Sequence, residues 1–258
     1  VITEDGIESS KPFPEEKLRP CIFEHVYFAR PDSHVNEMNV YEVRKRIGAE
    51  LARESGVEAD LVIPVPDSGT PSAIGYAQEA NTPFELGIIR NHYVGRTFIE
   101  PSDQIRHLGV KLKLNANRGT IKGKRIVLVD DSIVRGTTSM KIVNLMREAG
   151  ASEVHMCIAS PPTAHSCFYG VDTPERKKLL DTRMDDVEAM REPIKADSLT
   201  FIAIDGLYRA VNQPNGRDKK CPAFCDACFT GDYPTHLTDQ AEEEQSERQL
   251  ESIASSGS

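Results

Sequence analysis

Short apolar runs alternate with stretches of helical periodicity along most of this chain. Runs typical of buried strands cover 22–29, 60–65, 84–89, 125–131, 154–159 and 199–204. Apolar residues recur at helical spacing over 40–52, 70–80 and 140–146, with further helical signals at 174–180, 185–195 and up to 211. Because strands that alternate with helices form βαβ units, this order predicts an α/β fold with a twisted parallel sheet flanked by helices.

Four segments divide the chain. Residues 1–20 are polar and interrupted by prolines, as in a linker, and 21–212 hold the predicted α/β domain. Residues 213–237 form a Cys-rich region, and the acidic, Ser-rich tail 238–258 is expected to be disordered. Within the domain, 92–120 has no sustained period but many Arg, Lys, Asn and Gly residues, which predicts a long, mobile functional loop. Asn39 is a candidate N-cap for the helix at 40–52.

Composition narrows the possible partners and the compartment. The net charge of −9 over 258 residues disfavours nucleic acid as a partner. No run of about 18 apolar residues and no signal-peptide core is present, so we expect no membrane association and a cytoplasmic location. In that compartment the six cysteines are expected to be thiols or metal ligands rather than disulfides. Because the chain starts with Val1, we expect its start to differ from that of the gene product.

Two adjacent carboxylates, Asp130 and Asp131, follow the apolar run 126–129 and precede a Gly-Thr-Thr-Ser stretch at 136–139. A lone Asp pair is often a solvated strand end. Here it lies where ligands bind in open parallel sheets, and the next helix begins with free amides and hydroxyls that suit a phosphate. The spacing around Lys124 does not fit a Walker loop. The arrangement predicts a site for a sugar phosphate with a hard cation.

Six motifs carry a resemblance to a known family. The segment VDDSIVRGTTS resembles the signature of type I phosphoribosyltransferases that binds phosphoribosylpyrophosphate (PRPP), and its wording is similar to that of the glutamine PRPP amidotransferase family. The same family resemblance is carried, in order, by YFARPDS, VPDSG, NHYVGRTFI, KLNANRG and CFYGVD. The resemblance runs from about 21 to 234 and implies the type I phosphoribosyltransferase fold with a flexible loop.

The resemblance also implies roles for individual residues. Asp130 and Asp131 would contact the ribose hydroxyls and, with Ser68, bind Mg²⁺. Pyrophosphate would be held by Asp67, Ser68 and Gly69, and the 5-phosphate by the loop Ser132, Ile133, Val134, Arg135, Gly136, Thr137 and Thr138. The segment 90–118 would close over the substrate, with Arg96 as a candidate catalytic cation and Tyr93 as a candidate substrate contact, besides Lys111 and Lys113. Each of these could equally be a solvated charge or an ordinary packing residue.

The cysteines form a second group of candidates. The pair Cys225 and Cys228 is a C-x-x-C motif that by itself fits zinc, redox chemistry or chance, although no βαβ pattern surrounds it to favour redox chemistry. The family resemblance implies, for its bacterial iron–sulfur type, a [4Fe–4S] cluster held by Cys21, Cys167, Cys225 and Cys228. Zinc remains an alternative, Cys221 offers a competing register, and Cys157 is expected to be a small buried residue.

The resemblance implies that the chain is the C-terminal half of an enzyme that makes 5-phosphoribosylamine from PRPP and ammonia, the first step of purine synthesis. It further implies a glutaminase domain, absent here, as the source of ammonia, inhibition by purine nucleotides and homo-oligomer formation. Two alternatives remain: a regulator that binds PRPP or nucleotides without catalysis, and a transferase specific for a purine or pyrimidine base.

Overall fold

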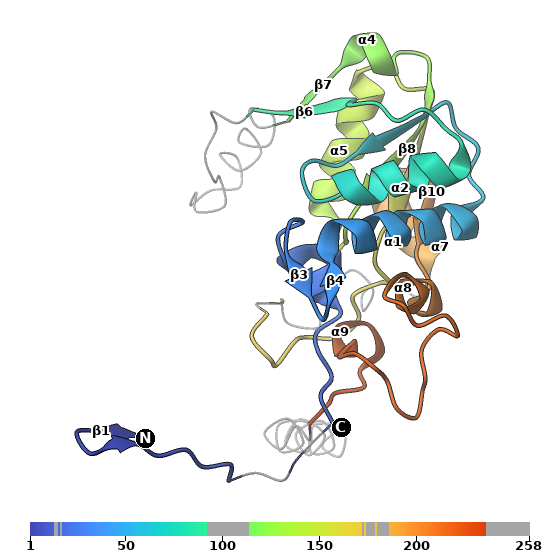
Figure 1. Cartoon of the computed structure of the whole chain (residues 1–258). Coiled ribbons are helices and arrows are strands. Elements are labelled where there is room, and N and C mark those ends of the chain that lie inside the picture. Colours follow the sequence, from blue (N-terminus) through green and yellow to red (C-terminus); the bar gives the residue numbers. More distant parts are fainter. Residues whose placement is uncertain are drawn as a thin grey trace, which may run out of the picture.

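A four-stranded parallel sheet forms the centre of the computed structural model, which describes residues 1–12, 15, 17–91, 114–171, 173, 179 and 186–235 (Figure 1). Its strands are β5 (Leu61–Pro64), β8 (Arg125–Asp130), β9 (Glu153–Ile158) and β10 (Ser198–Phe201), in the order β10-β9-β8-β5. The predicted parallel sheet is therefore confirmed, and β8 lies inside it, between β5 and β9.

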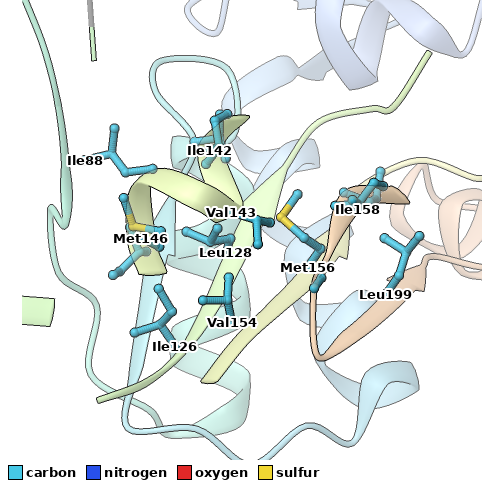
Figure 2. Packing of buried hydrophobic residues seen from close by; sticks show 14 of the residues in the cluster. Ile88, Ile126, Leu128, Ile142, Val143, Met146, Val154, Met156, Ile158 and Leu199 are labelled. Carbon is cyan, nitrogen blue, oxygen red and sulfur yellow. The ribbon is translucent and has the colours of Figure 1, made fainter. Parts of the chain in front are cut away.

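Helices cover both faces of this sheet. The helices are α1 (Val40–Ser55), α2 (Thr70–Ala80), α5 (Thr137–Glu148), α7 (Val187–Ile194) and α8 (Ile204–Ala210). On one face, α5 and α7 pack on Ile126, Leu128, Val154 and Met156 (Figure 2). On the other face, α1, α2 and α8 pack on Val62, Val127, Val129 and Cys157. Alternate residues of β8 thus enter different cores, which is why its apolar run is continuous.

The two helices α1 and α2 cross in close contact because glycines lie at the crossing. A Cβ atom on Gly48 would lie 1.8 Å from the carbonyl oxygen of Ser72, and one on Gly75 would lie 1.9 Å from that of Lys45. The predicted cap of α1 is confirmed, since the Asn39 side chain accepts a hydrogen bond of 3.1 Å from the Glu42 amide.

Smaller elements surround this centre. They are β1 (Ile2–Thr3), β2 (Gly6–Ile7), the π-helix η1 (Glu24–Phe28), β3 (His34–Val35), β4 (Met38–Asn39), β6 (Ile88–Arg90), β7 (Leu114–Ala116), α4 (Arg118–Ile121) and α9 (Ala227–Thr230). None of the described helices is long and apolar enough to span a membrane.

One strand prediction was wrong, and a second was confirmed only in part. The run 22–29 contains the π-helix instead, with Ile22 and Val26 buried at a helical spacing; a short apolar run does not distinguish a strand from a buried helix. The run 84–89 joins the main sheet only through a bridge between Phe84 and Val62, and its end forms an antiparallel pair with β7. The predicted helix at 174–180 lies almost entirely outside the described residues, and the predicted disordered tail at 238–258 lies entirely outside them.

We expect Gly48→Ala to lower the free energy of unfolding by about 2 kcal/mol or more, because the new methyl group collides with the backbone of α2. Gly119→Ala in α4 is the matched control, since its Cβ would lie no closer than 3.7 Å to a neighbouring atom. Urea unfolding of both variants measures the difference. Equal stability of the two would contradict the close crossing.

Candidate active site

The acid pair lies at the carboxyl end of β8. Asp130 is the last residue of the strand, and each of the two side chains is only 7 % exposed. The Asp131 amide donates a hydrogen bond of 2.9 Å to Asp130 Oδ1, and the Ser132 hydroxyl donates one of 2.6 Å to Asp131 Oδ1. The predicted ligand edge of the sheet therefore holds two buried carboxylates side by side.

Burial governs the charge state of this pair. Loss of solvation raises the pKa of Asp130, and repulsion from Asp131 raises it further. Burial also raises the pKa of Asp131, while hydrogen bonds from Ser132 and Ser68 and the charge of Arg44 act in the opposite direction. A bound cation would relieve the repulsion, and two carboxylates with a hydroxyl offer the hard oxygen ligands that Mg²⁺ prefers.

Arg44 is a buried cation that acts on this site, and no sequence pattern predicts its role. Its side chain is 2 % exposed on α1. The guanidinium donates hydrogen bonds to the carbonyl oxygens of His25 at 3.0 Å, Ala29 at 2.8 Å and Glu24 at 3.4 Å. Arg44 therefore holds the π-helical segment in place while its charge acts on Asp131.

The loop after β5 contributes the second part of the site. Gly69 begins α2, and a Cβ atom there would lie 2.4 Å from the carbonyl oxygen of Val129, so only glycine fits this approach of the loop to β8. The Ser68 side chain lies near Asp131 and acts to lower the pKa of that carboxyl. Asp67 forms an ion pair with Arg90 at the end of β6. The structure thus brings Ser68 and Asp131 together.

The predicted phosphate loop joins β8 to α5. Gly136 caps the helix with a φ of 76°, in the left-handed region that favours glycine. Arg135, Thr137 and Thr138 are exposed next to the helix start, whereas the Ile133 side chain is buried in the core. Ile133 can therefore offer only main-chain groups to a ligand, while Ser132 and Val134 are partly buried. Arg96, Tyr93, Lys111 and Lys113 lie outside the described residues.

Four cysteines from distant parts of the chain, Cys21, Cys167, Cys225 and Cys228, lie near one another. Cys21 and Cys225 form a parallel bridge, in which the Ile22 amide donates to the Cys225 carbonyl at 3.0 Å. The Cys228 carbonyl accepts from the amides of Ala164 and His165, each at 3.0 Å, close to Cys167 in sequence. Burial raises the pKa of the Cys228 thiol, and the neighbouring thiols Cys21, Cys225 and Cys167 raise it further.

Backbone amides lie near three of these sulfur atoms. The Tyr169 amide donates a hydrogen bond of 3.4 Å to the Cys167 sulfur. The amides of Phe23 and Glu24 act to lower the pKa of Cys21, and the amide of Ala227 acts to lower that of Cys225, although burial raises both. Within the described residues, no three His, Cys, Asp or Glu side chains are close enough to form a finished metal site. The four thiols therefore lie near one another, but their sulfur atoms do not surround a single metal position.

The other two cysteines differ from these four. Cys221 is exposed, and its sulfur accepts a hydrogen bond of 2.8 Å from Lys17 Nζ. Cys157 is fully buried in β9, as expected of a small core residue, and burial raises the pKa of its thiol to about 12.

A buried carboxylate anchors the Cys-rich segment, and no pattern in the sequence predicts its burial. Asp226 is 0 % exposed and accepts a hydrogen bond of 2.8 Å from the Tyr208 hydroxyl on α8. Arg217 forms an ion pair with it, Arg19 lies 3.7 Å away, and both arginines also pair with Asp232. This network ties residues on both sides of the C-x-x-C motif to the domain.

The fold and the acid pair define a phosphoribosyl-transferring domain, and a family model described as phosphoribosyl transferase domain matches residues 35–187. The chain belongs to this family. The amidophosphoribosyltransferase of Rhizobium etli is 59 % identical over 256 residues, which cover 99 % of this chain and 51 % of the relative. That of Bacillus subtilis is 49 % identical over 237 residues, covering 92 % of this chain and 49 % of the relative.

Solved structures agree with these relatives. The glutamine PRPP amidotransferase from B. subtilis, complexed with ADP and GMP, superposes with a TM-score of 0.79 at 49 % identity, covering 92 % of this chain and 51 % of that chain. A solved structure of the allosteric regulatory enzyme of purine biosynthesis superposes on this chain with a TM-score of 0.78 at 48 % identity, covering 92 % of this chain and 50 % of that chain. The chain spans about half the length of the curated relatives it matches.

His25, which lies in the π-helix η1, makes the stability of the folded chain sensitive to acid. Its ring is fully buried, and neither ring nitrogen has a hydrogen-bond partner among the residues that the structure describes. Burial together with Arg44 and Arg46 lowers its pKa from 6.5 to about 4. Between these values the unfolded chain binds a proton that the folded chain does not, so stability falls as the pH falls from about 6.5 to 4, by about 3 kcal/mol.

We expect His25→Leu to remove this acid-dependent loss while keeping the stability at pH 7. Denaturant unfolding at several pH values measures it. His34→Leu, which replaces an exposed histidine, is the control and should leave the pH profile as it is. An unchanged profile in His25→Leu would contradict the assignment.

Proposed function

We propose that this chain is the phosphoribosyl-transferring part of an amidophosphoribosyltransferase, acting in the first step of purine synthesis. It takes PRPP and ammonia and releases 5-phosphoribosylamine and pyrophosphate. The proposal is supported by the relatives of that name, which are 59 % and 49 % identical to this chain. The proposed reaction needs no exposed basic surface for nucleic acid, and the net charge of −9 agrees with this.

One observation carries the proposal: the loop after β5 lies so close to the end of β8 that a Cβ atom on Gly69 would be 2.4 Å from the Val129 carbonyl oxygen, directly before the acid pair. This contact joins the loop proposed to hold pyrophosphate to the carboxylates proposed to hold the ribose. A sugar that carries pyrophosphate on C1 and phosphate on C5 spans these two groups and the start of α5, where free amides and the hydroxyls of Thr137 and Thr138 suit a phosphate.

The residues then have separate roles in the transfer. Asp130 and Asp131 hold the ribose hydroxyls, and their negative charge favours the positive charge that develops on the sugar as the bond at C1 breaks. Asp67, Ser68 and Gly69 hold the pyrophosphate as it leaves, and Arg96 and Tyr93 act from the segment that closes over the substrate. When bound at Ser68, Asp130 and Asp131, Mg²⁺ supplies charge that stabilises the leaving pyrophosphate.

We infer that Cys21, Cys167, Cys225 and Cys228 would hold a [4Fe–4S] cluster of the bacterial type, because thiolates are the usual ligands of such clusters. The inference is supported by the position of Cys228 near the other three thiols. The Tyr169 amide donates a hydrogen bond to the Cys167 sulfur, and such bonds set the potential of a cluster. When bound, the cluster supplies a structural link between the segment before η1, the loop after β9 and the C-terminal turns.

The remaining parts of the proposal concern the whole protein. We infer that a glutaminase domain supplies ammonia, that the protein acts in the cytoplasm as a homo-oligomer, and that purine nucleotides inhibit it. The inhibition is supported by the B. subtilis structure, which is complexed with ADP and GMP.

Ammonium, PRPP and Mg²⁺ should together yield pyrophosphate, which a coupled phosphate assay measures. We expect Asp131→Asn to slow this release by about 100-fold or more, because a charge opposed to that of the transition state is lost. Asp60→Asn is the control: Asp60 pairs with Arg125 at the other end of β8 and should keep full activity. If the chain binds PRPP but releases no pyrophosphate, the result would favour a regulator. If it releases pyrophosphate with free bases but not with ammonium, the result would favour a base-specific transferase.

Cys228→Ser should abolish the iron and acid-labile sulfide content of anaerobically purified protein and its visible absorption, since one of four thiolates is lost. Cys221→Ser should retain them, because Cys221 is exposed and its sulfur contacts Lys17. Metal and sulfide analysis measures both. Zinc without sulfide in the parent chain would contradict the cluster, and loss of iron in Cys221→Ser would contradict the chosen register.

A further inference from the structure

The segment that holds Cys21 lies against the segment that holds Cys225. The Cys225 amide donates a hydrogen bond of 2.8 Å to the Pro20 carbonyl, and the Ile22 amide donates one of 3.0 Å to the Cys225 carbonyl. Cys21 and Cys225 are therefore opposite each other in a parallel bridge. Two main-chain hydrogen bonds between two irregular segments are weak by themselves, so this bridge needs support from side chains.

Asp226, the residue after Cys225, is held by hydrogen bonds to both of its carboxylate oxygens. Oδ2 accepts one of 2.8 Å from the Tyr208 hydroxyl and another from Arg217 Nε. Oδ1 accepts one of 3.0 Å from the Thr230 hydroxyl and one of 3.2 Å from Arg217 Nη2. A fully buried carboxylate with this set of donors is fixed in one orientation, and it fixes the backbone of the C-x-x-C motif with it.

Arg19 connects this carboxylate to the segment before η1. Its Nε donates a hydrogen bond of 3.2 Å to the Phe224 carbonyl, and its Nη2 donates one of 3.1 Å to the Asp232 carbonyl. The same Nη2 lies 3.7 Å from Asp226 Oδ1. Arg19 thus ties the segment that leads into Cys21 to residues on both sides of the C-x-x-C motif.

The main chain extends this arrangement to the two remaining cysteines. The Phe229 amide donates a hydrogen bond of 2.9 Å to the Asp226 carbonyl, which closes the turn that contains Cys228. The Cys228 carbonyl in turn accepts one of 3.0 Å from the His165 amide, two residues before Cys167. All four segments that carry the proposed ligands are therefore joined, directly or through one hydrogen bond, to the residues around Asp226.

The charges of this network cancel. Arg19 and Arg217 carry two positive charges, and Asp226 and Asp232, with which both arginines pair, carry two negative ones. Asp226 is fully buried and both arginine side chains are nearly so, which strengthens their attraction. Thiolates that lie side by side repel one another, and an unpaired carboxylate would add to that repulsion. The arginines make a carboxylate tolerable at this place.

We propose that Asp226, with Arg19 and Arg217, is the positioning group of the cysteine site and sets the places of its ligands before a cluster binds. The proposal rests on the proposed iron–sulfur site. Asp226 is not a ligand itself, since both of its oxygens are occupied by donors from the protein. It acts through the backbone on either side, as outer partners of a metal site do when they orient the ligands.

Loss of iron to a chelator tests the proposal on the full chain after anaerobic reconstitution with iron and sulfide. We expect Asp226→Asn to speed the loss by about 10–100-fold and Arg19→Gln by about 10-fold, because ligands that are no longer held in place release the metal sooner. Decay of the visible absorption and the iron content per chain measure it. Glu50→Gln is the matched control, since Glu50 also pairs with two arginines, Arg53 and Arg209. Its Tm should fall while iron is lost at the parental rate.

The outcomes separate this proposal from the one on which it rests. Parental rates of iron loss in Asp226→Asn and Arg19→Gln, even with a lower Tm, overturn the positioning role and leave the iron–sulfur site standing. Equally fast loss in Glu50→Gln overturns it too, because general destabilisation then explains the effect. A parent chain that takes up no cluster overturns the iron–sulfur site and the positioning role with it. If Asp226→Asn does not fold, the rate in Arg19→Gln decides.

Discussion

The burial of two adjacent carboxylates at one strand end is the constraint on which the rest of this structure depends. Asp130 and Asp131 repel each other and are shielded from water, so the folded chain must compensate for them. It does so with the hydroxyls of Ser132 and Ser68 and with the charge of Arg44. These groups come from three separate elements, and their convergence fixes how the β5 loop, the β8 loop and α1 meet. The site and the fold are specified by the same contacts.

Periodicity predicted the framework because β8, α5 and α1 each bury a regular apolar set. Alternate residues of β8 enter two cores, and α5 places Ile142, Val143 and Met146 on one of them. The run 22–29 misled for a physical reason: it is short and carries exposed aromatic residues, Tyr27 and Phe28, beside buried ones, so its pattern does not distinguish a strand from a helix. The approach of Ser68 to Asp131 was expected only from the family resemblance, since no local pattern links residues that lie 63 positions apart.

Buried polar residues were the part that the sequence could not predict. Arg44, Asp226 and His25 belong to residue types that are mostly exposed or only partly buried, so surface positions were the better expectation for them. Their burial depends on tertiary partners, such as the carbonyl oxygens around Arg44 and the two arginines around Asp226.

The two groups of chemistry-bearing residues are joined through the segment that follows Cys21. Arg44 donates to three carbonyl oxygens within 24–29, and its charge acts on Asp131. The same segment begins at the bridge between Cys21 and Cys225, and Asp226 anchors the far side of that bridge to α8. A buried guanidinium without a direct carboxylate contact is costly, and hydrogen bonds to a fixed backbone are what make it tolerable. The cysteine region therefore contributes to the electrostatics of the acid pair through the backbone that it holds in place.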